Sequence, residues 1–104
     1  MIVECLHIKI APSYREVFVQ KDDEIWTSFL RQCPGFLRKE VWISTNDLSE
    51  VRLSIYWATL EQQQAISQSQ LDAIQSEFVT ALDVPYQLLE IQLYQMRKST
   101  LRSA

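Results

Sequence analysis

The chain has 104 residues, of which 47% are hydrophobic, and this length fits a single domain whose core is too small to bury every apolar side chain. The formal net charge is −3, and without the last eight residues, which hold three bases and no acid, it is −6. So acidic a body excludes a nucleic-acid interface built from clustered Lys and Arg. The sequence has no run of about 20 apolar residues, so we expect neither a membrane span nor a signal peptide, and a cytoplasmic location.

The sequence also lacks the residues that most cofactor sites need. Its single glycine, Gly35, excludes glycine-rich nucleotide loops, which need more than one. One histidine, His7, and no close pair of cysteines argue against a structural zinc site. Cys5 and Cys33 lie far apart in the chain, and we expect both to be reduced apolar side chains. We therefore expect no metal and no organic cofactor.

The first elements are a strand and a helix. Residues 2 to 10 alternate between apolar and mixed side chains, which predicts a strand, and Glu4 is a charged exception on the apolar side. Ser13, with a glutamate three residues later, predicts a capping box that begins a helix. The acidic run at 22–24 interrupts the apolar stripe of this helix and is predicted to face solvent. Trp26, at the edge of the stripe, is either an ordinary core or interface aromatic or part of a pocket wall.

A hairpin follows the segment Cys33-Pro34-Gly35-Phe36. Glycine adopts positive φ without a Cβ penalty and proline cannot continue a helix, so this segment ends the helix and begins a strand in a new direction. The strand alternates over 36–43, with Leu37 on the apolar side, Phe36 on the mixed side and Lys39 breaking the apolar set. A turn at 45–49 and a second alternating strand at 50–58 complete the hairpin.

Two N-cap patterns divide the segment 60–83. Thr59, and then either Ser67 or Ser69, is followed three residues later by a polar partner. We therefore expect a short helix, a break and a longer helix, which Pro85 stops.

The last strand is predicted at 86–98. The order of elements is then βαββαβ, which with right-handed crossovers predicts an α+β ferredoxin-like sandwich. Such a fold has a four-stranded antiparallel sheet with both helices on one face. Residues 1–98 are expected to form one domain, followed by a short flexible tail at 99–104.

The alternation also predicts the two faces of the sheet. The side chains expected under the helices are Ile2, Leu6, Ile8, Leu37, Val41, Ile43, Val51, Leu53, Ile55, Trp57, Leu89, Ile91 and Leu93. The opposite face, called here the open face, carries Val3, Cys5, His7, Arg38, Glu40, Trp42, Arg52, Ser54, Tyr56, Leu88, Glu90, Gln92, Tyr94 and Met96. It is too apolar for a solvent face and too polar for a second core, so we expect a second copy of the chain to cover it. The polar members must then pair with each other, with water or with a ligand, because an unpaired buried polar group costs about 1 to 3 kcal/mol.

Several segments resemble a known family. The turn Cys33-Pro34-Gly35-Phe36 after a long helix, the strand Phe36-Leu37-Arg38-Lys39-Glu40-Val41-Trp42, and a tryptophan that ends the next strand before Thr59-Leu60-Glu61 are similar to the antibiotic biosynthesis monooxygenase superfamily. The run Lys21-Asp22-Asp23-Glu24-Ile25-Trp26-Thr27 together with Lys39-Glu40-Val41-Trp42 resembles a branch of small cyanobacterial proteins in that superfamily.

The resemblance implies a homodimer, a dimeric α+β barrel whose two sheets face each other. It also implies a pocket either between each sheet and its helices or in the lumen of the barrel. Relatives include cofactor-free monooxygenases, haem-degrading oxygenases, isomerases, cyclases and regulatory proteins. The haem-degrading relatives need a histidine in the second helical region, and this chain has none between 60 and 83, which argues against haem chemistry here.

The candidate catalytic residues are His7, Tyr56 and Glu90. In a sheet of order 4-1-3-2, His7 is expected to lie beside Tyr56 and Ser54 on one side and beside Glu90 and Gln92 on the other. A histidine next to a carboxylate and a phenol suits general acid–base catalysis near neutral pH. The alternative is a histidine that simply satisfies its hydrogen bonds within a dimer interface.

The candidate ligand-binding residues share the open face with His7. They are Arg38, Glu40, Trp42, Arg52, Gln92 and Tyr94. The charged members either anchor an anionic ligand or form an ion-pair network that fixes the register of the dimer. The aromatic members either wall a site for an aromatic substrate or pack the dimer.

Two classes of function remain open. One is a cofactor-independent enzyme, of the monooxygenase, cyclase or isomerase type, that transfers protons on an aromatic or polyketide-like substrate. The other is a non-catalytic homodimer that uses the same lumen to bind a small ligand or a protein partner. An RNA-binding sheet of this topology is disfavoured, because it needs bases beside its aromatic side chains and this body is acidic.

Overall fold

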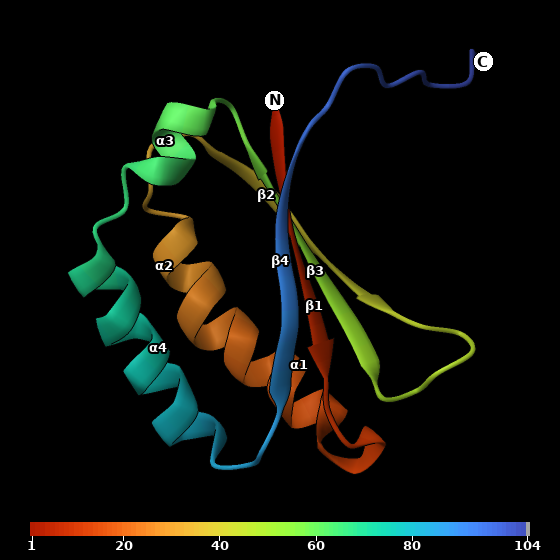
Figure 1. Ribbon diagram of the computed structural model, residues 1–104, viewed down its shortest axis with the longest axis vertical. Coiled ribbons are helices and arrows are strands. Elements are labelled where there is room, and N and C mark those ends of the chain that lie inside the picture. The colour runs from red at the N-terminus through yellow and green to blue at the C-terminus, as the bar shows by residue number, and fades with distance from the viewer. Residues whose placement is uncertain (104) are drawn as a thin grey trace.

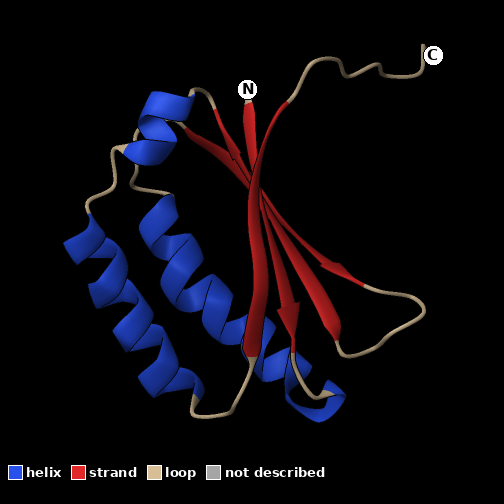
Figure 2. Cartoon of the chain, viewed as in Figure 1, coloured by secondary structure: helices blue, strands red, loops and turns tan. Residues whose placement is uncertain are grey.

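The computed structural model describes residues 1–103, and its centre is a four-stranded antiparallel sheet of order β2-β3-β1-β4. The strands are β1 (Ile2–Lys9), β2 (Phe36–Ile43), β3 (Glu50–Trp57) and β4 (Gln87–Gln95). All helices cover one face of this sheet, as Figures 1 and 2 show. The predicted ferredoxin-like α+β fold and its strand order are confirmed.

The helical layer consists of two long segments. The first runs through η1 (Pro12–Tyr14), α1 (Arg15–Asp22), the π-helical turn η2 (Asp23–Thr27) and α2 (Ser28–Leu30). The second comprises the short α3 (Leu60–Gln64) and the longer α4 (Gln68–Leu82), which lies beside the first segment in Figure 1. No helix within residues 1–103 is both long and apolar enough to cross a membrane.

The capping predictions are confirmed for the second segment and wrong for the first. The Thr59 hydroxyl accepts a hydrogen bond from the Gln62 backbone, and Ser67 forms a complete capping box with Gln70. Ser13 lies inside the 3-10 turn η1, and no side chain caps η1 or α1. The chain thus enters α1 through a tighter turn in which the predicted box does not form.

Gly35 has the positive φ that its position predicts, at 86°. A Cβ at this position would clash with the side chain of Gln62. The Gly35 carbonyl also accepts a hydrogen bond of 2.8 Å from the backbone of Ala58. Gly35 therefore lets the start of β2, the end of β3 and the helix α3 approach each other closely.

The core lies between the sheet and the helices. Phe18 of α1, Phe78 of α4 and Tyr86 contact each other edge to face, with ring centroids 5.4 to 5.9 Å apart. A second cluster centres on Trp57, which is fully buried and packs with Leu30 and Ile55. These clusters attach the helices to the central strands β1 and β3.

The predicted faces are correct on the central strands and need correction on both edge strands. Between Phe36 and Arg38 the register of β2 shifts, so that Phe36 lies opposite Trp57 and packs against it. A second shift lies between His7 and Ile8, where Leu88 becomes the partner of Ile8 and reaches the helix side of the sheet. Phe36 and Leu88 were both predicted on the other side, because one extra residue in a strand inverts the alternation.

The open face is largely uncovered in a single chain. Trp42 and Tyr94 each expose 50% of their surface, and β4 is exposed along its whole length. Cys5 and Cys33 are free thiols, as predicted. The predicted tail begins after β4, where residues 99–103 have neither helix nor strand, and residue 104 lies outside the described residues.

Candidate ligand pocket

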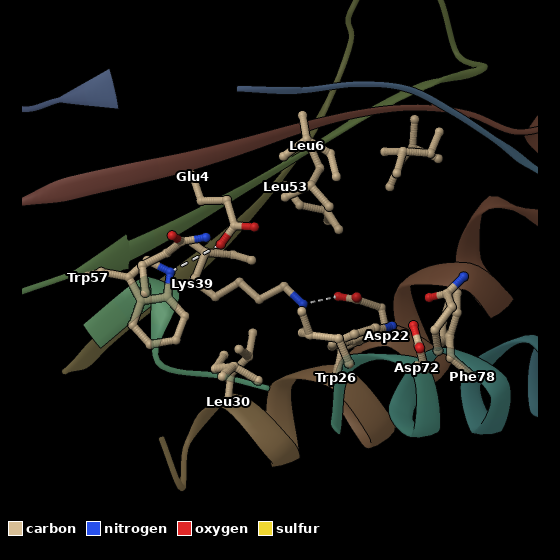
Figure 3. A pocket seen from close by; sticks show the side chains of 18 of the residues that line it. Glu4, Leu6, Asp22, Trp26, Leu30, Lys39, Leu53, Trp57, Asp72 and Phe78 are labelled. Atoms are coloured by element: carbon tan, nitrogen blue, oxygen red, sulfur yellow. Dashed lines mark hydrogen bonds and ion pairs between the residues drawn. The ribbon is translucent and has the colours of Figure 1, made fainter. Parts of the chain in front are cut away.

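A cavity of about 350 Å³ lies between the sheet and the helices (Figure 3). Most of its lining is apolar, and the aromatic side chains of Trp26, Trp57, Phe78 and Tyr86 contribute to it. Pockets for small molecules usually measure about 300 to 1,000 Å³ and combine apolar walls with a few polar groups. This cavity, called here the inner pocket, is therefore of a size to hold a small organic molecule.

An irregular turn in the helical layer shapes one wall. The π-helical turn η2 widens the chain between α1 and α2, and Trp26 of this turn reaches the inner pocket. Thr27, at the end of the turn, is buried. Short π-helical turns are rare and occur frequently at functional sites. The same turn follows directly on Asp22, the last residue of α1, which also lines the inner pocket.

The most unusual polar feature of this wall is a buried ion pair. Lys39 of β2 places Nζ 2.6 Å from Oδ2 of Asp22, and the two side chains are only 4% and 3% exposed. Nζ also donates a hydrogen bond of 3.1 Å to the hydroxyl of Thr27. Burial raises the pKa of Asp22, and this effect outweighs the nearby Lys39 ammonium, which lowers that pKa.

The wall of the inner pocket has hydrogen-bond acceptors that the protein does not fully satisfy. Lys39 is the one donor that reaches Oδ2 of Asp22 within residues 1–103, and the second lone pair of this oxygen has no donor. Oε1 of Gln63, another residue of the lining, has no donor at all within the described part of the chain. Such atoms are uncommon in folded proteins, and each one calls for an explanation such as a ligand or an ordered water. The inner pocket thus offers two acceptors to its contents.

A third polar group of the pocket is satisfied within the protein. Oε1 of Glu4 accepts a hydrogen bond of 3.2 Å from the indole nitrogen of Trp57. Figure 3 shows this pair and Asp22 on opposite sides of the view, with the Lys39 side chain between them. These polar groups are therefore spread along the cavity, and Asp72 of α4, which also lines it, lies on the same side of the view as Asp22.

The sequence contains a signal for these residues, although it did not mark them as a site. Glu4 and Lys39 are the charged exceptions in strands that otherwise present apolar side chains to the helices, and both do point inward. Asp22 was predicted to be solvated with the rest of its acidic run, which is wrong, because it is 2% exposed. Opposite charges at inward positions of two elements would have suggested their pairing.

The predicted neighbours of His7 are only half correct. His7 lies opposite Arg52 on β3 and opposite Glu90 on β4. Its Nε2 is 3.3 Å from Oε1 of Glu50, a carboxylate that was not predicted. Tyr56 lies opposite Val3, four positions away along β1, which corresponds to roughly 13 Å of strand. The expected contact between the imidazole and the phenol is therefore wrong.

Tyr56 belongs instead to a second cluster on the open face. Its hydroxyl donates a hydrogen bond of 2.9 Å to Oε1 of Glu40. The guanidinium of Arg38 lies 4.0 Å above the Tyr56 ring and pairs with Glu40 at 3.4 Å. Such a stacked arginine gains both a cation–π and an ionic contact.

The predicted ligand-binding set is thus divided. Arg52 pairs with Glu50 at 2.9 Å rather than with Glu40, and it lies opposite Trp42. Gln92 and Tyr94 lie opposite Cys5 and Val3 on the same face. None of the candidate catalytic or ligand-binding residues predicted from the sequence lines the inner pocket. Within residues 1–103, no group of three or more His, Cys, Asp or Glu side chains is arranged to hold a metal ion.

The fold matches solved structures of enzymes, whereas sequence comparison gives no match. No family model and no curated protein matches the sequence. A monooxygenase from Streptomyces coelicolor, solved in complex with nanaomycin D, is 20% identical, with a TM-score of 0.74 over 98% of this chain and 92% of its own. SnoaB, a cofactor-independent oxygenase from Streptomyces nogalater, is 16% identical, with a TM-score of 0.65 over 94% of each chain.

A third similar structure is described as dimeric. It is a ferredoxin-like protein from an uncultured marine organism, 16% identical, with a TM-score of 0.69 over 97% of this chain and 98% of its own. Other similar structures are assigned provisionally, by their names, to the antibiotic biosynthesis monooxygenases. The chain therefore has the fold of antibiotic biosynthesis monooxygenase-type proteins.

Proposed function

We propose that this chain is a cofactor-independent enzyme that transfers protons on an aromatic or polyketide-like substrate held in the inner pocket. The reaction is of the monooxygenase, cyclase or isomerase type, all of which begin by removing a proton from an activated position. The observation that carries the proposal is an apolar cavity whose wall holds a buried carboxylate, Asp22, paired with the buried ammonium of Lys39. A buried carboxylate with a raised pKa is suited to act as a general base.

The similar structures support this type of chemistry. One is a monooxygenase in complex with nanaomycin D, and another is a cofactor-independent oxygenase. Because their identities to this chain are 20% and 16%, they support the fold, and the chemistry is inferred from the pocket.

The assembly proposed with this function is a homodimer formed through the open face. The half-exposed Trp42 and Tyr94 add two large aromatic side chains to that face, and the similar marine protein is dimeric. In this arrangement the clusters around Glu50 and Glu40 become interfacial ion pairs, and the inner pocket of each subunit stays on the far side of its sheet.

A second candidate function is supported by the open face itself. His7, Glu50 and Arg52 form a polar cluster on that face, which suits a non-catalytic dimer that binds a small ligand or a protein partner in the lumen. The two candidates differ in where a small ligand sits.

Tryptophan fluorescence locates the ligand. Trp26 and Trp57 line the inner pocket, whereas Trp42 is on the open face. Titration with 1,4-naphthoquinol and 2-hydroxyacetophenone is expected to quench the wild type and Trp42→Phe equally. Quenching that disappears in Trp42→Phe places the ligand in the lumen and contradicts the proposal.

Turnover of the same compounds tests the enzyme. We expect Lys39→Met and the pocket-filling Leu71→Phe to lose at least tenfold in kcat/KM, while His7→Ala keeps its activity. Val79→Phe is the matched control, because Val79 is on the same helix as Leu71 and exposed. Turnover that falls in His7→Ala but not in Lys39→Met would move the chemistry to the open face. If the compounds quench the fluorescence but none is turned over, the protein binds ligands without catalysis, and the enzyme proposal is contradicted.

A further inference from the structure

We infer that Asp22 and Lys39 form a subsite for an acidic hydroxyl group, a phenol or an enol, and that this subsite ionises the hydroxyl within the inner pocket. The inference rests on the proposed function in one respect, namely that the inner pocket is where the ligand binds. It adds the chemical class of the ligand group and the residues that receive its proton.

The first step of the argument is that this ion pair is incomplete as a structural element. A buried pair stabilises a fold only when further hydrogen bonds satisfy its remaining lone pairs and protons. Lys39 Nζ, at 2.6 Å, is the one donor to Oδ2 of Asp22 within residues 1–103, and this carboxylate oxygen has a second lone pair. The Lys39 ammonium has three N–H donors, and the contacts of Nζ in the same residues are with Asp22 and Thr27 alone. One acceptor and one donor therefore remain side by side in a wall of the cavity.

The second step identifies the group that fits this pair of valences. A hydroxyl both donates and accepts, so it can donate to Asp22 and accept from Lys39. A carboxylate has no proton to donate and would be repelled by Asp22, and an ammonium cannot accept from Lys39. The surrounding wall includes Trp26 and Phe78, which favours a hydroxyl carried on an apolar, aromatic body. A water molecule meets the same polar requirement and is the occupant that such a ligand displaces.

The third step is the proton transfer. The O–H bond of the ligand breaks, the proton moves to Oδ2 of Asp22, and the electron pair stays on the ligand oxygen. That oxyanion faces the Lys39 ammonium, so the site remains neutral overall before and after the transfer. Burial raises the pKa of the Asp22 carboxyl and so makes it a stronger base than an exposed aspartate.

Asp22 and Lys39, although buried, also line a second, more open hollow at the edge of β2, together with Arg31 and Asp23. The acid formed on Asp22 thus lies between the inner pocket and a solvent-facing hollow. The proton has a short route to solvent once the ligand anion has reacted or left.

The test uses 7-hydroxycoumarin, a phenol whose neutral and ionised forms differ in their excitation spectra. Its matched control is 7-methoxycoumarin, which has the same ring system and no proton to lose. We expect both compounds to bind the wild type. The apparent pKa of bound 7-hydroxycoumarin is expected to fall by at least one unit. At a pH below the pKa of the free dye, this means a roughly tenfold higher ratio of phenolate to phenol. Calorimetry in buffers of different ionisation enthalpy is expected to show no proton released to the buffer on binding.

Variants assign the effect to the two residues. In Asp22→Asn, binding is expected to release one proton to the buffer for each phenolate bound, because Asn cannot receive it. Asp22→Leu combined with Lys39→Met replaces the pair by apolar side chains of similar size. Such a replacement usually preserves stability, so the double variant is expected to fold. We expect this double variant to bind 7-methoxycoumarin as the wild type does and to leave the pKa of 7-hydroxycoumarin unchanged.

The failures of the inference and of the proposed function are distinct. A dye that binds in the inner pocket with its pKa unchanged overturns the ionising subsite and leaves the pocket standing. If the double variant lowers the pKa of the dye as much as the wild type does, the ionising subsite is likewise overturned and the pocket still stands. If neither coumarin binds, the inner pocket is not a site for aromatic ligands, and the proposed function falls together with the inference.

Discussion

Lys39 and Asp22 show how two residues that look ordinary in the sequence acquire an unusual environment. Lys39 comes from an edge strand and Asp22 from the end of α1, and each charge is buried only because the other is present. Taking charges out of water costs several kcal/mol for each ion, and their attraction repays this only when geometry and further hydrogen bonds are good. Here the pair is short but not fully satisfied, which suits a site better than a structural brace.

The cost of breaking the pair can be measured. Lys39→Met leaves Asp22 as a buried carboxylate without its counter-charge, and we expect a loss of about 3 to 5 kcal/mol in the free energy of unfolding. Denaturation by urea, followed by far-ultraviolet circular dichroism, measures it. Adding Asp22→Leu removes the unpaired charge and should recover most of the loss. A single variant as stable as the wild type would show that the pair is exposed to water in solution.

The pH dependence of stability follows from the raised pKa of Asp22. Because the pKa is higher in the folded than in the unfolded chain, the folded state binds the proton more tightly. The stability that Asp22 contributes is thus fully present below its ordinary pKa of about 3.9 and is lost as pH rises through its folded value. The charges that face it are Lys39, which opposes this shift, and Asp23, which adds to it.

Asp22→Asn is the variant that isolates this effect. It cannot titrate at position 22, so the stability of the wild type relative to Asp22→Asn should decrease as pH rises from about 4 towards neutrality. Urea titrations of both proteins at several pH values measure the difference. A difference that is constant, or that grows with pH, would mean that Lys39 rather than burial dominates the carboxyl.

At the scale of elements, local chemistry determines where the second helical segment begins. In the capping box the backbone N–H of Gln70 donates to the Ser67 hydroxyl and the backbone N–H of Ser67 donates to the Gln70 side chain, at the start of α4, the helix that carries Phe78 to the core. We expect Ser67→Ala to lose about 1 kcal/mol of stability. The matched control is Ser76→Ala within the same helix, which should change stability by a few tenths of a kcal/mol at most. Equal losses in both variants would show that the box contributes nothing.

Elements also mark where prediction from the sequence stops. Alternation identified all four strands, and the caps at Thr59 and Ser67 located the second helical segment. The shifts near Phe36 and Leu88 could not be predicted, because a period of two does not reveal one inserted residue. The π-helical turn η2 was missed for a similar reason, since its extra residue leaves the apolar stripe readable as an ordinary helix.

The candidate site was harder to predict than the fold. The charged residues on the open face attracted attention because they are many and polar, whereas Glu4 and Lys39 were noted only as exceptions in apolar sets. Whether an inward charge is a flaw or a function depends on its partner, and the partner of Lys39 lies on another element, 17 positions earlier in the chain. Local patterns of hydrophobicity carry no information about such pairs.

At the scale of the whole molecule, the fold has one covered and one uncovered side. The helices bury the central strands on one face of the sheet and leave β4 exposed, while Trp42 and Tyr94 keep half of their surface exposed on the other face. These two aromatic side chains lie on the edge strands β2 and β4, on a face that also carries His7, Arg52 and Tyr56, and we expect a partner to cover this mixed face. A two-fold symmetric dimer would bring the open faces of both copies together. The charged clusters around Glu40 and Glu50 would then lie in the interface.

We therefore expect the chain to be a dimer at micromolar concentration, as measured by light scattering after size-exclusion chromatography. Trp42→Glu together with Tyr94→Glu replaces two exposed aromatic side chains on the edge strands of the open face by charges, and we expect the dissociation constant to rise at least tenfold, which corresponds to about 1.4 kcal/mol. Val79→Glu on the outer surface of α4 is the matched control, because Val79 is about as exposed as Trp42 but lies on the helix side. A wild-type chain that stays monomeric at these concentrations contradicts the assembly, and the inner pocket, which one chain forms alone, would then have to work without it.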